Sequence, residues 1–181
     1  MKLAACLVLV ACAARPPAVK VAADLPALVS TDGVTEGLGT GITVIEFFSA
    51  HCPCQRAHDQ RLSELYAHFH TAGVRFLVVD VEADSSLAID QREAQERHYP
   101  FPIWRDDSGS FADYFQADYA TYSVVLDGKG HLAYRGGIDS DKVYLQSNAE
   151  PWLRDAVSAV LAGQAPRKPE TKSFGCELRR R

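Results

Sequence analysis

The sequence has little positive charge, which excludes one large class of partner. Its 19 lysines and arginines are outnumbered by 23 aspartates and glutamates, so the formal net charge is −4. No aromatic residues are interleaved with basic ones, as a nucleic-acid surface would require. The one basic cluster, Arg179-Arg180-Arg181, is typical of a solvated tail. We therefore expect no nucleic-acid partner.

Long hydrophobic runs, internal repeats and low-complexity tracts are also missing. The apolar residues 3–10 follow Lys2 and form a stretch too short to span a bilayer. A positive residue before a short apolar stretch predicts an export signal. Leu9-Val10-Ala11-Cys12 resembles a bacterial lipobox, in which the cysteine receives lipid. Ordinary cleavage within Ala11-Cys12-Ala13 is the alternative.

These features predict how the first part of the sequence is used. Residues 1–12 are predicted to be a signal peptide with Cys12 as the lipidation site, and residues 13–24 an extended tether containing Pro16 and Pro17. The protein is then expected to be exported and anchored through lipid at the periplasmic or outer face of a bacterial membrane.

The remaining sequence contains enough apolar residues for one core, because 47% of the 181 residues are hydrophobic. We expect one domain at residues 25–164 and an extended tail at residues 165–181. Strand-like and helix-like patterns alternate, which predicts an α/β fold with a central mixed β-sheet flanked by helices. The predicted strands are residues 42–48, 74–81, 101–104, 122–126 and 131–135, the last two as a hairpin. Four helices are predicted. The first starts near the cysteines and ends at Gly73, and the second runs from Ser85 or Ser86 to Tyr99. The third runs from Ser108 to Phe115, and the fourth from Ser147 or Asn148 to Gly163.

Two cysteines, Cys52 and Cys54, follow the first buried strand and are separated by Pro53. Proline is favoured at the first helical position, which would place Cys52 at the helix start. Unpaired N–H groups and the positive end of the helix dipole favour a thiolate there. Cys52 is therefore predicted to be the nucleophile, supported by His51 when protonated, with Cys54 as the resolving thiol.

The order of these motifs resembles the thioredoxin fold, and more narrowly the redoxins of the alkyl hydroperoxide reductase and thiol-specific antioxidant family. The matching stretches are Phe47-Phe48-Ser49-Ala50-His51-Cys52-Pro53-Cys54, Phe101-Pro102-Ile103-Trp104-Arg105-Asp106 before Gly109, Val124-Val125-Leu126-Asp127-Gly128 before Tyr134-Arg135-Gly136, and the tail Ser173-Phe174-Gly175-Cys176. The resemblance implies a thiol-disulfide oxidoreductase that acts on protein or small-molecule disulfides or thiols. It also implies a separate redox partner and no cofactor.

The sequence departs from this family at two positions that bear on activity. Ser49 matches the hydroxyl of the peroxidase loop, but Ile45 occupies the place of its proline. Thr121 stands where peroxidases carry an arginine and where thioredoxins carry a cis-proline. Without that arginine, no obvious group polarises a peroxide oxygen. Efficient peroxidase activity is therefore not expected, and substrate docking is expected to differ from that of thioredoxins.

The spacing of the cysteines leaves the disulfide pairing open. A bond between Cys52 and Cys54 closes a small ring, and strain makes a disulfide easier to reduce. Cys176 is the alternative partner, provided that the tail folds back across the helix start. Pro166 and Pro169 favour an extended path, and the tail is long enough to reach.

Other interpretations compete with a redox function. Cys52, Cys54 and His58 form a possible copper site, because thiolates and imidazole are ligands for that metal; a redox-inert scaffold is a further alternative. Glu46 and Asp80 interrupt or end predicted strands. A carboxylate beneath a site of this kind can accept protons, but we interpret both as ordinary strand-end charges.

Overall fold

The computed structural model describes residues 25–180, and the predicted signal peptide, Cys12 and the tether lie outside them. Seven strands form one sheet: β1 (Leu28–Ser30), β2 (Thr35–Glu36), β3 (Thr43–Phe48), β4 (Arg75–Asp80), β5 (Ile103–Arg105), β6 (Tyr122–Leu126) and β7 (Leu132–Gly137). Four helices accompany it: α1 (Pro53–His70), α2 (Leu87–Glu96), α3 (Ser110–Phe115) and α4 (Trp152–Leu161). None of the helices described has the length and apolar character needed to cross a membrane.

The sheet is mixed, which confirms the predicted fold class. Its strand order is β2-β1-β5-β4-β3-β6-β7, with β3, β4 and β5 parallel and the remaining pairs antiparallel. All six residues of β3 are buried, because this strand has a neighbour on each side and helices on both faces. The two short strands β1 and β2 were not predicted, since three and two residues are too few to show a strand period.

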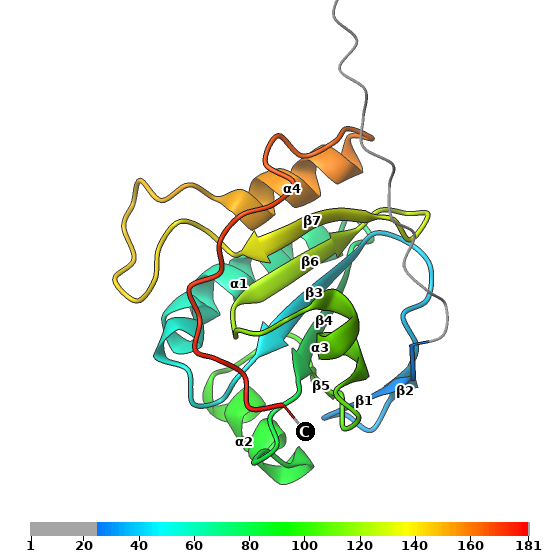
Figure 1. The fold of residues 1–181 in the computed structure, drawn as a ribbon, viewed down its shortest axis with the longest axis vertical. Helices are drawn as coiled ribbons and strands as arrows, with labels where there is room; N and C mark the ends of the chain where they lie inside the picture. The colour runs from blue at the N-terminus through cyan, green and yellow to red at the C-terminus, as the bar shows by residue number, and fades with distance from the viewer. Residues whose placement is uncertain (1–24, 181) are drawn as a thin grey trace, which may run out of the picture.

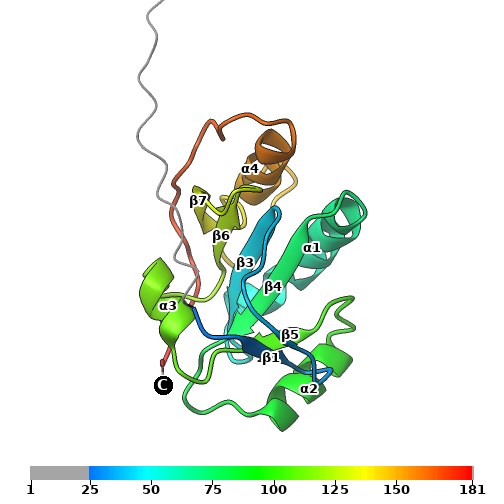
Figure 2. The ribbon, with the colours of Figure 1, turned by 90° about the vertical axis from the view of Figure 1, so that its right-hand side faces the viewer.

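The helices form two layers around the sheet (Figure 2). Helices α1, α2 and α4 cover one face, and the shorter α3 lies on the other. Alternate residues of β3 point to opposite faces. Val44 packs with Leu65 of α1, whereas Phe47 packs with Phe111 of α3.

Helix α4 begins later than the sequence predicts. The expected start was Ser147 or Asn148, but the helix starts at Trp152, directly after Pro151. A proline keeps the preceding residue, here Glu150, away from helical backbone angles. The segment before it is therefore excluded from the helix.

Two other helix ends also differ from expectation. Helix α2 stops at Glu96 rather than Tyr99, and His98 has a positive φ of 52° that a helix cannot continue through. The N-cap residue of α3 is Gly109 rather than Ser108, and the carboxylate of Asp106, three residues earlier, accepts the backbone N–H of Phe111 at 2.8 Å.

Residues 164–180 run extended along the molecule and form neither helix nor strand of the sheet (Figure 1, orange to red). We call residues 169–180 the strap. Its first part lies against β7, where Thr171 donates its backbone N–H to Arg135 O at 3.1 Å. A Cβ on Gly136 would lie 2.1 Å from the Thr171 hydroxyl oxygen, so a side chain there would block the strap. The strap then crosses toward the first turn of α1.

Candidate thiol site

Cys52 lies at the junction between β3 and α1. It is the N-cap residue with extended backbone angles, Pro53 is the first helical residue, and the carbonyl of Cys52 accepts the N–H of Arg56 at 3.0 Å. The first turn of α1 contains no acidic side chain. The free N–H groups and the positive end of the dipole therefore act on the Cys52 sulfur without a competing negative charge.

The strap brings Cys176 to this helix start. The backbone N–H of Cys176 donates to Cys52 Sγ at 3.2 Å, and Cys54 Sγ donates to Phe174 O at 3.2 Å. All three cysteines of the described residues are free thiols. Cys52 is only 1% exposed, and the strap lies against its sulfur at Cys176. The site therefore brings three thiols together at the start of α1.

The electrostatics of the three thiols distinguish Cys52 from its neighbours. Burial, and then the nearby Cys52 sulfur, raise the pKa of Cys54. The same two causes raise the pKa of Cys176 to about 12. A negative charge on Cys52 therefore opposes ionisation of the other two. Of the three thiols, only Cys52 combines a place at the helix N-terminus with a backbone N–H donor from the strap.

A short loop before β6 holds the strap through backbone hydrogen bonds. Ala120 N–H donates to Cys176 O at 2.8 Å, and Leu178 N–H donates to Asp118 O at 2.8 Å. Tyr119 and Glu177 lie between these bonds as an antiparallel bridge. Residues 118–120 and 176–178 therefore pair as two short antiparallel strands.

Thr121 ends this loop in an unusual backbone conformation. Its φ is 59°, which β-branched residues rarely adopt, and its N–H donates to Phe47 O at 2.9 Å. Its hydroxyl lies 3.5 Å from that of Ser173, at the limit of a hydrogen bond. Thr121 thus contacts the strap at the end of the segment, residues 118–120, that pairs with it.

The loop that precedes Cys52 is fixed from two sides. Cys52 N–H donates to Ser49 O at 3.3 Å, and Ser49 is buried. Arg97, at the end of α2, donates from Nη2 to Ala50 O at 2.7 Å. His51 is exposed, and within residues 25–180 its ring makes no hydrogen bond. Ser49 thus contacts Cys52 through its backbone carbonyl, whereas His51 faces solvent.

The buried ring of His58 is held by two hydrogen-bond acceptors. Its Nδ1 lies 2.8 Å from Cys54 O and its Nε2 lies 3.1 Å from Asp139 Oδ1, so acceptors engage both ring nitrogens. Burial opposes a charge on the ring, but the hydrogen bonds to Asp139 and Cys54 raise its pKa overall. A ring that donates from both nitrogens has no lone pair for a metal. Across the described residues, no three metal-ligating side chains are grouped.

Glu46 and Asp80 are not the ordinary strand-end charges that we expected. Glu46 lies within β3, is 0% exposed, and burial raises its pKa to about 8 despite a hydrogen bond from Ser123. Asp80 ends β4 but is equally buried, and burial together with the Asp90 carboxyl raises its pKa to about 8. Glu46 shares the α1-facing side of β3 with Val44, so it lies beneath the helix that carries Cys54.

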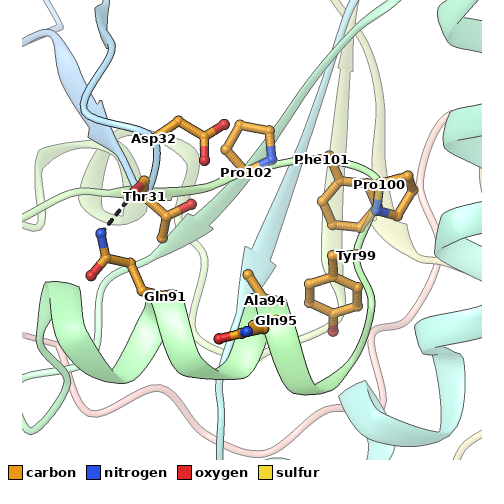
Figure 3. A pocket seen from close by; sticks show the side chains of 9 residues that line it. All are labelled: Thr31, Asp32, Gln91, Ala94, Gln95, Tyr99, Pro100, Phe101 and Pro102. Carbon is orange, nitrogen blue, oxygen red and sulfur yellow. Dashed lines mark hydrogen bonds between the residues drawn. The ribbon is translucent and has the colours of Figure 1, made fainter.

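A separate hollow of about 370 Å³ lies between α2 and the turn after β1 (Figure 3). The side chain of Gln91 donates to Thr31 O across it at 3.0 Å, and the Tyr99 ring borders its other end. None of its lining residues is a cysteine or takes part in the hydrogen bonds of the Cys52 and Cys54 sulfur atoms. This hollow is therefore not part of the thiol site.

No protein-family model matches the chain, and a comparison with curated proteins finds no match. Solved structures do match. An uncharacterised conserved protein from Geobacillus kaustophilus is 24% identical with a TM-score of 0.81, over 92% of this chain and 93% of the other. A hypothetical protein from Sinorhizobium meliloti 1021 is 20% identical with a TM-score of 0.80, over 92% and 97% of the two chains.

More distant matches include proteins whose activity is described. The bacterioferritin comigratory protein of Xanthomonas campestris, described in connection with alkyl peroxide reduction, has a TM-score of 0.55 at 16% identity, over 78% of this chain and 90% of its own. The thioredoxin domain of a thiol-disulfide oxidoreductase from Bacteroides vulgatus has a TM-score of 0.56 at 14% identity, over 66% and 89%. These likenesses establish a thioredoxin-like fold.

Proposed function

We propose that this protein is a thiol-disulfide oxidoreductase in which Cys52 is the nucleophile and Cys176 resolves the mixed disulfide. The observation that carries the proposal is the hydrogen bond from Cys176 N–H to Cys52 Sγ at 3.2 Å, at the N-terminus of α1. The structural neighbours support the same class, since they include thioredoxin-like oxidoreductases and peroxide-reducing redoxins.

The reaction starts at Cys52. Its thiolate attacks one sulfur of a substrate disulfide, a Cys52–substrate disulfide forms, and the second substrate sulfur leaves as a thiolate. The Cys176 thiol loses its proton, and its thiolate attacks Cys52 Sγ, which forms the Cys52–Cys176 disulfide and releases the first substrate sulfur as a thiolate that takes up that proton. Two protein thiols are oxidised and one substrate disulfide is reduced. An external dithiol then restores the protein, and the reverse sequence oxidises a substrate dithiol.

Two features favour Cys176 over Cys54 for the second step. A disulfide between Cys52 and Cys54 would close a strained ring across Pro53 at a helix start. Cys54 also donates its S–H to Phe174 O, a hydrogen bond that favours its protonated form. Cys54 is then a third thiol, which stays reduced while the Cys52–Cys176 bond forms.

Glu46 provides a proton acceptor beneath the site. Its pKa of about 8 allows it to gain and lose a proton near neutral pH. It lies on the α1-facing side of the sheet and interacts electrostatically with His58. The ring of His58 in turn hydrogen-bonds to the backbone carbonyl of Cys54. We assign Glu46 to proton uptake when a thiol of α1 ionises.

The proposed location is outside the cytoplasm, with the domain tethered by lipid on Cys12. The motif around Cys12 supports this part of the proposal, because it resembles a lipobox, in which the cysteine receives lipid. Protein or small-molecule disulfides and an unidentified redox partner are the proposed reactants.

Disulfide mapping tests the assignment of the thiols. Mild oxidation of the reduced full-length protein, followed by proteolysis and mass spectrometry, should give a Cys52–Cys176 bond. The Cys54→Ser variant should retain this bond and the Cys176→Ser variant should lose it. A bond between Cys52 and Cys54, with Cys176 fully alkylatable, would contradict the role of Cys176 and leave that of Cys52 intact.

A further inference from the structure

The strap occupies its place through main-chain pairing. The bonds from Ala120 N–H to Cys176 O and from Leu178 N–H to Asp118 O involve backbone atoms only. Strand pairing of this kind accepts any extended segment in principle, and specificity then comes from the side chains at each position. The groove along residues 118–121 can therefore hold another extended segment in place of the strap.

One position in this groove has no room for a side chain. A Cβ built on Gly175 would lie 1.6 Å from Ala120 O and 2.4 Å from its carbonyl carbon. Both atoms belong to backbone that is held by the pairing to Cys176 and by the bond from Thr121 N–H to Phe47 O. They cannot yield as a flexible side chain would. Space therefore requires glycine at this position, immediately before the cysteine that meets Cys52.

The neighbouring positions accept apolar side chains. The ring of Phe174 lies 6.1 Å from that of Trp152, at an interplanar angle of 33°. Leu178, two residues after the cysteine, is 6% exposed and packs in the same core cluster as Cys52. An open cavity of about 440 Å³ continues beside the strap, between Tyr119 and Ser173. The groove thus has an aromatic position, a glycine position, a cysteine position and an aliphatic position.

We propose that the groove along residues 118–121 selects, as reaction partners of Cys52, extended protein segments in which a glycine directly precedes the reacting cysteine. The strap is the resident occupant of this groove, and a substrate segment replaces it in the same orientation. An aromatic residue before the glycine and an aliphatic residue two positions after the cysteine strengthen the fit. This inference rests on the proposed function, because it names the substrate class of the same thiol site.

The strap must be displaced before such a segment binds. A tethered segment has a high effective concentration at its own site, so free peptides compete with it poorly. Two changes open the groove by independent means. Gly175→Ala prevents the strap from seating, and the double change Arg179→Glu with Arg180→Glu reverses the charges that pair with Asp84 and Asp113. Both variants also carry Cys54→Ser and Cys176→Ser, so that an adduct on Cys52 persists.

The probes are two hexapeptides, Ser-Phe-Gly-Cys-Glu-Leu and Ser-Phe-Ala-Cys-Glu-Leu, each with its cysteine in a mixed disulfide with 2-nitro-5-thiobenzoate. The Cys52 thiolate attacks the peptide cysteine sulfur, the new disulfide forms, and nitrothiobenzoate leaves as the thiolate. Absorbance follows the leaving group, and mass spectrometry quantifies the peptide on Cys52. Glutathione, which has no groove, provides the reference for the intrinsic reactivity of both peptides.

Both opened variants should react at least about tenfold faster with the glycine peptide than with the alanine peptide, since backbone overlap of this size cannot be relieved. Glutathione should react with the two peptides at equal rates. Equal rates in the two opened variants would overturn the glycine selection and leave the proposed function standing. Failure of Cys52 to exchange with either peptide or with free dithiobis(nitrobenzoate) would overturn the proposed function itself. The charge-reversal variant retains Gly175, so the result does not depend on one substitution.

Discussion

The backbone N–H of Cys176 donates to the sulfur of Cys52 at 3.2 Å, although 124 positions separate the two residues along the chain. This bond places a donor on the sulfur at the helix start and places the Cys176 thiol beside it. The arrangement leads to predictions on reactivity, stability and location.

Cys52 should be the first of the three thiols to be alkylated by a small reagent such as iodoacetamide. The pKa values of Cys54 and Cys176 are raised by burial and by Cys52, whereas the helix N-terminus favours the Cys52 thiolate. Timed labelling of the reduced protein at pH 7 to 9, with peptide mapping, measures the order. Labelling of Cys54 or Cys176 at the rate of Cys52 would contradict the assignment.

Gly175→Ala should release the strap from the thiol site. The added methyl group overlaps the backbone of Ala120, and such overpacking typically costs about 1 to 3 kcal/mol. Cys52 should then be labelled faster, and the Cys52–Cys176 disulfide should form more slowly.

Gly128→Ala is the matched control for this prediction. A Cβ at Gly128 meets no atom within 4 Å, so this change should leave both rates as in the wild type. Thermal unfolding of the two variants checks that the domain is folded. Unchanged labelling of Cys52 in Gly175→Ala would show that the strap does not cover the sulfur in solution.

Glu46→Gln should change how stability depends on pH. The folded-state pKa of Glu46 is about 8, above its unfolded value near 4.3. Between these values the folded protein holds a proton that the unfolded chain has lost, so raising the pH destabilises the fold. Glutamine has no proton to lose and can keep the hydrogen bond from Ser123.

As the pH rises from 5 to 9, the free energy of unfolding of the Glu46→Gln variant should therefore increase by a few kcal/mol relative to that of the wild type. Each pKa unit corresponds to about 1.4 kcal/mol. Urea unfolding across this range measures the difference. Glu64→Gln, an exposed change on α1, is the control and should follow the wild-type curve. Parallel curves for wild type and Glu46→Gln would mean that Glu46 is ionised throughout.

Cys12→Ala should convert a membrane-associated protein into a soluble one with the same folded domain. Lipid on Cys12 is the proposed anchor, and alanine cannot receive it. Fractionation of cells that express each form, with mass determination of the mature N-terminus, tests this. A wild-type protein that is fully soluble and begins after Ala13 would support ordinary signal cleavage.

The sequence predicts the layers of this fold because apolar periods are local properties. Residues 43–48 and the spacing of Leu62 and Leu65 are sufficient to place β3 and α1. The short strands β1 and β2 depend on partners that are distant in sequence, so no local pattern reveals them. The start of α4 was predictable in principle, since Pro151 restricts the residue before it.

The thiol site was predictable only in part. Cys52 and Pro53 carry a local signal for a helix start. Glu46 also carried a signal, because a single carboxylate in a continuous apolar run has no exposed face to occupy, and we interpreted it wrongly. The need for Gly175 had no signal, since a glycine in a tail is usually a flexible or turn residue. Its reason is a tertiary contact with Ala120.

The 124 positions between Cys52 and Cys176 also connect redox state to folding. A disulfide between them would close a loop that includes most of the domain, and a loop of that length restricts the unfolded chain by an amount typically worth about 4 to 5 kcal/mol. The oxidised form would then be harder to unfold than the reduced form. By the same thermodynamic cycle, the native fold would hold the disulfide against reductants that open it readily in the denatured chain. A partner that reduces this disulfide would therefore have to overcome the stabilisation that the native fold gives it. The reduced protein would then unfold more easily than the oxidised one.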